Sequence, residues 1–278
     1  MDQLRDHFSV RSCARVLGLR RATYYKRKQG HKPEEEDAII ATLLHDAVSQ
    51  YLAWGFWMIF HWLRKQGHSW NHKRVYRIWK AEDLNLRRPP QRPKLKRPFM
   101  DLIAPAFVNQ GWAIDFVSDW VIGPSQIPVR IINIIDECSR KVLWTEAHQS
   151  ITAQTLIGIL DKVIAWRGKP AYIRTDNGPE FISEALKAWA DDEARKIELR
   201  FIQPGKPTQN GLIERLNGTL RRECLNLVWF ESLDTLNQEI QQWWMTYNSI
   251  RPHSSLGYLT PDEFEEQQQK FYYSVVAA

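Results

Sequence analysis

Three consecutive strand patterns between residues 111 and 148 constrain the fold of this chain most strongly. The segments WAIDFVSDWVI, VRIINIID and KVLWTEAH are rich in β-branched and aromatic residues, and short turns separate them. A helical pattern follows, then strand AYIRT, helix ISEALKAWADDEA, strand IELRFI and a helix from Asn210. Antiparallel strands followed by alternating helices and strands predict an α/β fold, a mixed five-stranded sheet with helices on its faces.

Three carboxylates lie at points of this pattern where a core residue or a turn is expected. Asp115 interrupts an apolar strand, and Asp176 follows strand AYIRT in an Asp-Asn-Gly turn that exposes its carboxylate. Glu214 lies on the polar side of the last helix, opposite Ile213 and Leu216. Burying several carboxylates together is costly unless a cation neutralises them, so the pattern predicts a site for divalent metal.

The chemistry of such a site follows from the ligands. Hard cations such as Mg²⁺ prefer oxygen donors and keep several waters, and two of them can stabilise both the entering and the leaving oxygen of a phosphodiester. Cys13, Cys138 and Cys224 are scattered without paired spacing, and His61, His68 and His72 lack partner cysteines, so neither a disulfide framework nor a zinc module is expected. No GxxxxGK[ST] motif is present, so no ATP site is expected.

The motifs WxxDF, TDNGPEF, QPGKPxQNGxIERxNGTxRxE and YNSIRPHSSLGYLTPDEF occur in this order over most of the chain. Together they resemble the DDE transposases of the bacterial insertion-sequence family called IS-three, second-reading-frame products related to retroviral integrases. The resemblance implies a ribonuclease H-like catalytic core in which Asp115, Asp176 and Glu214 are the catalytic, metal-binding triad. It also implies two Mg²⁺ ions, for which Mn²⁺ can substitute. The interval between Asp176 and Glu214 is two residues longer than the family usually has, and we place the insertion near ADDEARK.

Other acids near the motifs are candidates for supporting roles. Asp119 shares a strand face with Asp115 by parity, Asp136 ends the neighbouring strand, and Glu180 follows the Asp-Asn-Gly turn. We expect these three to be structural or supporting groups.

The front of the chain is strongly basic. Residues 1–100 carry 21 Lys and Arg against 9 Asp and Glu, whereas residues 101–278 carry 17 against 23. This division predicts a DNA-binding front joined to a metal-using enzyme. We predict an all-α helix-turn-helix at 1–32, a helical DNA-binding domain at 33–86 whose third helix is capped by Asn71, and a basic, proline-rich linker at 87–104. The candidate DNA contacts there are Arg20, Arg21, Lys26, Arg27, Lys73, Arg74 and Arg77.

We predict that the catalytic core with its C-terminal extension covers 105–267 and that 268–278 form a tail without a readable pattern. Candidate DNA contacts in the core are Lys206, Gln209, Asn210 and Arg221. Arg251 and His253 lie in a segment broken by proline, where contact with DNA and a structural clasp are both open. The front tryptophans are expected in the core: Trp54, Trp57, Trp62, Trp70 and Trp79.

The expected function is transposition: metal-dependent cleavage at the ends of an insertion element, followed by transfer of the freed 3′-hydroxyl to a target. The alternatives are a DNA-binding regulator without catalysis and a plain metal nuclease. The expected partners are double-stranded DNA, meaning terminal repeats and target, further copies of the chain on DNA, and an upstream-frame protein or fusion, which the resemblance implies. No membrane segment or signal peptide is apparent, so a cytoplasmic, nucleoid-associated protein is expected.

Overall fold

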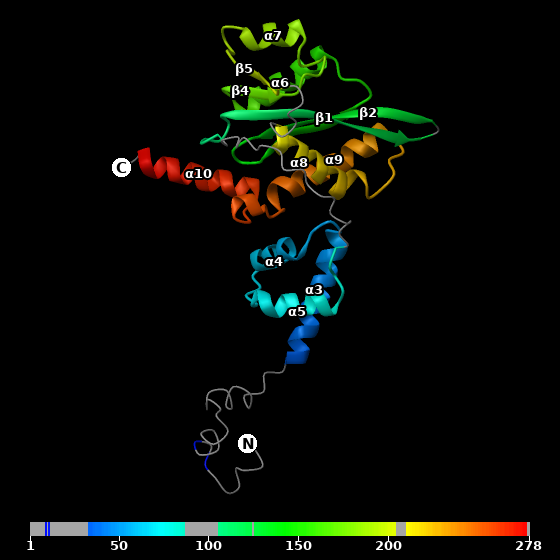
Figure 1. The fold of residues 1–278 in the computed structure, drawn as a ribbon, viewed down its shortest axis with the longest axis vertical. Helices are drawn as coiled ribbons and strands as arrows, with labels where there is room; N and C mark the ends of the chain where they lie inside the picture. The colour runs from blue at the N-terminus through cyan, green and yellow to red at the C-terminus, as the bar shows by residue number, and fades with distance from the viewer. Residues whose placement is uncertain are drawn as a thin grey trace.

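The computed structural model describes residues 33–86, 105–123, 125–203 and 210–276, together with Ser9 and Arg11. Figure 1 shows a small helical unit on one side of a sheet that has helices on both of its faces. Apart from Ser9 and Arg11, the helix-turn-helix predicted at 1–32 lies outside the described residues, as does the linker predicted at 87–104.

The helical unit contains the three helices expected in this part of the chain. Asn71 caps the third one, because its side chain accepts a hydrogen bond of 2.9 Å from the backbone N–H of Lys73. The helices are α3 (Pro33–Gln50), α4 (Phe56–Lys65) and α5 (His72–Ala81). Their shared core is apolar and includes Ile40, Leu44, Trp54, Ile59, Leu63, Val75 and Trp79.

The sequence predicted that all five front tryptophans lie in the core, and this prediction was wrong for one of them. Trp54 and Trp79 are buried, but Trp57 is 48% exposed. Each residue of an α-helix is turned by about 100° from the last, and α4 buries Ile59, Phe60 and Leu63. Trp57 therefore lies beside this buried face and not within it.

The sheet has five strands in the spatial order β3-β2-β1-β4-β5. Strand β2 pairs antiparallel with both β1 and β3, and β4 and β5 run parallel to β1. The strands are β1 (Gly111–Ile122), β2 (Gln126–Asp136), β3 (Val142–His148), β4 (Tyr172–Thr175) and β5 (Glu198–Phe201). The predicted order of elements and the mixed five-stranded sheet are confirmed.

Helices cover both faces of the sheet (Figure 1). One face packs on α6 (Ala153–Arg167) and α7 (Glu184–Asp191). The other packs on α8 (Gly211–Leu220), the π-helical turn η3 (Arg221–Leu225) and α9 (Leu233–Ser249). Among the described helices, none has the combination of length and apolar character needed to cross a bilayer.

The segment after α9 is a structural clasp, which decides between the two roles left open for Arg251 and His253. Arg251 Nη2 pairs with Glu223 Oε1 at 2.9 Å, and both side chains are largely buried. His253 is also buried, its ring 3.2 Å from the carbonyl oxygen of Tyr247, and burial lowers the pKa of His253 to about 3. Both side chains bind other residues of the protein, and they hold the segment after α9 against η3 and α9.

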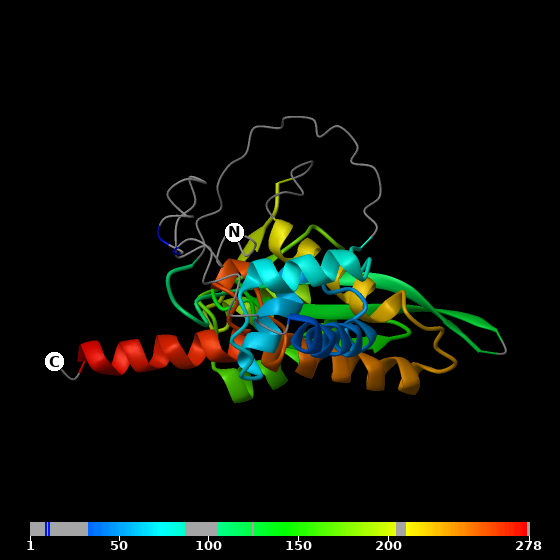
Figure 2. The same ribbon diagram turned by 90° about the horizontal axis from the view of Figure 1, so that it is seen from below.

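Residues 268–276, in which the sequence shows no readable pattern, belong to a helix. After the short 3₁₀ turn η4 (Ser254–Leu256), helix α10 runs from Pro261 to Val276. No Gly or Pro interrupts the sequence from Asp262 to Val276, so nothing in the backbone chemistry ends the helix earlier. Figure 2 shows α10 extending to one side of the molecule.

The helical unit contacts the C-terminal segment directly. The ring of His61 on α4 stacks on Tyr258, with ring centroids 3.8 Å apart. Lys65, one turn further along α4, pairs with Glu263 at the start of α10. The clasp therefore links the helical unit to the sheet domain.

We expect Glu223→Gln to lower the free energy of unfolding by about 3 kcal/mol, because it leaves the buried Arg251 guanidinium without its charged partner. Urea unfolding followed by fluorescence measures this change.

The matched control is Glu193→Gln. Glu193 pairs with Lys196 at 2.7 Å, but its side chain is 90% exposed, so no measurable change is expected. Equal stability of the two variants would contradict the clasp.

Candidate active site

Asp115 lies on β1, on the face of the sheet that α8 covers. Alternation along the strand places it on the same side as Ala113 and Val117, which belong to the core beneath α8. Both of its carboxylate oxygens accept hydrogen bonds. The backbone N–H of Phe116 donates to Oδ1 and the Asn217 amide donates to Oδ2, each at 2.8 Å.

The parallel pairing of β4 with β1 places Asp176 beside Asp115. The register aligns Ala113 with Arg174, and continuing it by two residues brings Asp176 level with Asp115. Asp176 directly follows β4, and its Oδ1 accepts a hydrogen bond of 2.9 Å from the N–H of Gly178. A Cβ on Gly178 would lie 3.1 Å from this same oxygen, so glycine allows the turn to close tightly around the carboxylate.

Glu214 lies in the first turn of α8 and is exposed. The helix buries Ile213, Leu216 and Leu220 against the sheet, which leaves Glu214 on its outer side as the sequence pattern predicts. Asn210 precedes the helix but makes no side-chain cap hydrogen bond.

Asp115 is affected electrostatically by the other two acids. Burial raises the pKa of Asp115 to about 6, and the nearby carboxylates of Asp176 and Glu214 raise it as well. The donors from Phe116 and Asn217 oppose this rise because they stabilise the ionised form. Three elements far apart in sequence thus bring three carboxylates into one electrostatic neighbourhood.

The donor set consists of oxygens only, which suits Mg²⁺ and not a metal that favours sulfur or imidazole. In the described parts of the chain, no group of three or more His, Cys, Asp or Glu side chains is arranged to hold one metal ion. Magnesium needs only one or two carboxylates because it keeps several waters. The carboxylate chemistry of Asp115, Asp176 and Glu214 fits that requirement.

The three supporting acids each have protein partners. Asp119 Oδ2 lies 3.4 Å from the Arg221 guanidinium, and Glu180 pairs with Arg130. Asp136 is fully buried and accepts hydrogen bonds from the backbone N–H groups of Asn109, Cys138 and Ser139. Asp136 therefore organises the turn after β2.

Of the four candidate DNA contacts of the core, the structure describes two. Lys206 and Gln209 lie outside the described residues. Asn210 is only 3% exposed, so its side chain is closed to a ligand in this structure. Arg221 is partly exposed and donates to the carbonyl of Ser118 at 2.6 Å as well as to Asp119.

The three candidate DNA contacts on α5 differ in exposure. Arg74 donates to Asp37 at 2.7 Å and also pairs with Glu36, while Arg77 pairs with Asp37. The acids of α3 thus pair with both arginines, and the Arg74 side chain is only 20% exposed. Lys73 is exposed, and the remaining candidates, Arg20, Arg21, Lys26 and Arg27, lie outside the described residues.

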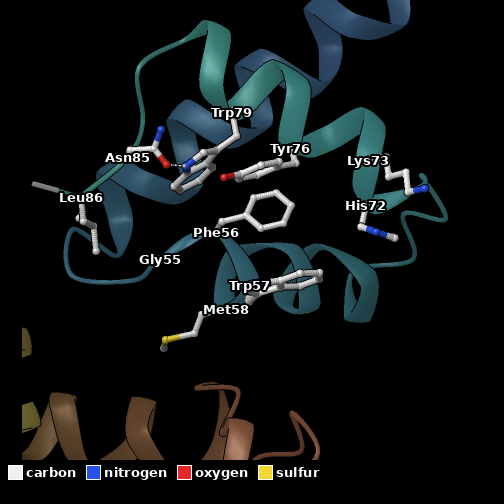
Figure 3. Close-up of a pocket in the computed structure, with 10 residues that line it drawn as sticks. All are labelled: Gly55, Phe56, Trp57, Met58, His72, Lys73, Tyr76, Trp79, Asn85 and Leu86. Atoms are coloured by element: carbon white, nitrogen blue, oxygen red, sulfur yellow. Dashed lines mark hydrogen bonds between the residues drawn. The ribbon is translucent and has the colours of Figure 1, made fainter. Parts of the chain in front are cut away.

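A pocket of about 820 Å³ opens between α4 and α5, next to Lys73 (Figure 3). Aromatic rings line it, and Phe56 and Tyr76 meet edge to face with their centroids 4.7 Å apart. Asn85, another residue of its lining, accepts a hydrogen bond of 3.2 Å from the Trp79 indole.

Two polar residues of the site were given no role from the sequence. Asn217 shares the polar side of its helix with Glu214, three positions before it, and this spacing is the signal that marks it. Asn133 is a lone amide within the apolar run IINIID. Its Nδ2 donates to Asn217 Oδ1 at 2.9 Å.

Comparisons with known proteins agree with this architecture. Two models described as integrase core domain match residues 106–207 and 195–261, and one described as HTH-like domain matches 34–92. An uncharacterised 31.7 kDa protein of insertion element IS407 from Burkholderia multivorans is 34% identical over 258 residues, covering 93% of this chain and 91% of that protein. The transposase InsD of insertion element IS2 from Escherichia coli is 24% identical over 245 residues, covering 84% of this chain and 80% of that protein.

The fold is also found in a simian T-cell lymphotropic virus intasome solved in complex with PP2A regulatory subunit B56 gamma. The match has a TM-score of 0.50 at 20% identity and covers 72% of this chain and 68% of that chain. The sheet and its helices therefore define an integrase-core protein with a ribonuclease H-like fold. Within that class, the chain belongs to the IS-three family of insertion-sequence transposases.

The raised pKa of Asp115 predicts a pH-dependent stability without metal. The folded protein binds the Asp115 proton more tightly than the unfolded chain, whose pKa is near 3.8. The stabilisation that this proton gives is complete below pH 4 and is lost as the pH rises through 6. We expect metal-free Asp115→Asn to be more stable than wild type at pH 8, by on the order of 2 kcal/mol, with the difference shrinking toward pH 4.

Thermal or urea unfolding of both proteins from pH 4 to 8, with a chelator present, measures this difference. Parallel stability curves for the two proteins would show that Asp115 titrates normally.

Proposed function

We propose that this transposase cleaves the ends of its element and joins them to target DNA at one site formed by Asp115, Asp176 and Glu214. The observation that carries the proposal is the convergence of these carboxylates: burial raises the pKa of Asp115 to about 6, and the nearby Asp176 and Glu214 carboxylates add to that rise. In the first step a water oxygen attacks phosphorus and the bond to the 3′ oxygen breaks, which leaves a 3′-hydroxyl. In the second step that hydroxyl attacks a target phosphodiester and displaces another 3′ oxygen.

The three carboxylates would hold Mg²⁺ here, two ions in our proposal, with Mn²⁺ able to substitute. Such ions, when bound, activate the attacking oxygen and stabilise charge on the leaving oxygen. The chain's own contribution is to orient the acids. Phe116 and Asn217 hold the Asp115 oxygens, and the Gly178 N–H holds one oxygen of Asp176.

DNA is the expected partner of the helical unit as well as of the core. The HTH-like match supports this role for α3, α4 and α5, and Lys73 presents an exposed charge beside the aromatic pocket. We further propose that the chain acts as an oligomer on terminal repeats and target, and that it requires an upstream-frame partner or fusion for efficient end binding.

The central test uses purified protein, a labelled duplex with the element's terminal repeat, and Mg²⁺. We expect Asp176→Asn to reduce both nicking and joining by at least about 100-fold, because several kcal/mol of charge stabilisation are lost. Asp191→Asn is the matched control, since Asp191 is an exposed acid at the end of α7 and its loss should leave both reactions unchanged.

Other outcomes of this test identify the two rival functions. Metal-dependent hydrolysis without joined products would indicate a plain nuclease. DNA binding without any product, with or without an upstream-frame partner, would indicate a regulator of element ends.

The helical unit provides a separate prediction for DNA affinity. We expect Lys73→Ala to weaken binding across sequences and to reduce the slope of log affinity against log salt by about 1, because one phosphate contact is lost. Fluorescence anisotropy at a series of salt concentrations measures this.

Lys187→Ala is the control, because Lys187 is an exposed lysine of α7 that pairs with Glu184 at 2.8 Å. An unchanged salt slope for Lys73→Ala would remove Lys73 from the DNA interface.

A further inference from the structure

A polar row crosses the apolar face of the sheet beneath α8. Asn133 on β2 lies directly opposite Asp115 on β1, and Thr145 on β3 lies directly opposite Asn133. Asn133 is 0% exposed and Thr145 is 2% exposed. Their neighbours on this face, Ile131 and Ile135, are fully buried apolar residues. An amide and a hydroxyl therefore replace apolar groups at the centre of a well-packed core.

The hydrogen bonds of this row have one possible direction. A carboxylate only accepts, so the amide that touches Asp115 must present its NH₂ group. Asn217 does so, and its oxygen then faces Asn133, which donates from Nδ2 at 2.9 Å. The carboxylate thus sets the orientation of the Asn217 amide, and Asn133 binds the oxygen that this orientation leaves facing β2.

This arrangement does not serve stability well. Asn133 Oδ1 and Thr145 Oγ1 are buried, and neither has a hydrogen-bond partner among the described residues. A buried polar atom without a partner destabilises the folded state, and an apolar group of the same shape avoids that cost. The hydrogen bond between Asn133 and Asn217 is therefore better explained by a role at the candidate active site than by a contribution to the stability of the core.

Asn248 shows what a structural asparagine looks like in the same protein. It is also buried, but both of its polar atoms bond to the backbone of Val142 on β3, at 2.9 and 2.8 Å. Its hydrogen bonds join α9 to the sheet and do not reach the acids.

We propose that Asn133 and Asn217 are positioning residues, a relay that holds the Asp115 carboxylate in the orientation needed for metal binding and DNA joining. The inference rests on the proposed function of Asp115. Asn217 acts on Asp115 directly, and Asn133 acts through Asn217.

The test compares three variants of the full chain, Asn133→Leu, Asn217→Ala and the matched control Asn248→Leu. Three quantities are measured: stability toward urea, Mn²⁺ affinity by calorimetry without DNA, and the kcat and KM of joining with the terminal-repeat duplex. We expect Asn217→Ala and Asn133→Leu to weaken Mn²⁺ binding and to lower kcat by about tenfold or more, with KM for DNA unchanged.

Stability separates this role from a structural one. Asn133→Leu should be as stable as wild type or more so, whereas Asn248→Leu should lose stability and keep its Mn²⁺ affinity and kcat. The double variant Asn133→Leu/Asn217→Ala should be no more impaired than Asn217→Ala, because the two residues act in series.

Wild-type Mn²⁺ affinity in both Asn217→Ala and Asn133→Leu would overturn the relay, as would a loss of kcat that only follows lost stability. If wild type neither nicks nor joins DNA, the proposed function fails, and the Mn²⁺ affinities still decide whether the relay orients Asp115.

Discussion

A carboxylate held between a central strand and a packed helix is the constraint on which this structure depends. Asp115 occupies a position where the neighbouring side chains on β1 are apolar, and burial raises its pKa to about 6. Such a group is tolerated because two donors bind its oxygens and because the elements around it are rigid. The parallel pairing of β1 with β4 then determines where Asp176 lies, and the apolar side of α8 determines where Glu214 lies.

The segments after α8 keep that helix in place. The chain continues from α8 into the π-helical turn η3, and Glu223 in η3 is bound by Arg251 of the clasp. The Trp243 indole also approaches Glu223, at 3.4 Å. Because the clasp contacts the helical unit through Tyr258 as well, one C-terminal segment connects the site to the HTH-like unit. Residues remote from the acids in sequence thus contribute to the position of Glu214.

Much of the fold and the acids could be predicted because their signals are local. Strand alternation, the Asp-Asn-Gly turn and the polar side of α8 each depend on a few neighbouring residues. The errors concern features that depend on a distant partner. Arg74 looked exposed on its own helix, but the acids that neutralise it lie on α3. Trp57 looked like a core residue by type, but the orientation of α4 leaves it half exposed.

The sequence by itself determined the order of the elements, the basic character of the front and the motifs of the family, and it singled out three acids as candidates. Those properties follow from composition and from periods of a few residues. Only the tertiary structure decided that Arg251 and His253 form a clasp, that Asn210 is closed, and that Asn133 reaches Asp115 through Asn217. The physical reason is that a hydrogen bond or an ion pair needs both partners within about 3 Å, and here the partners come from elements up to about a hundred residues apart.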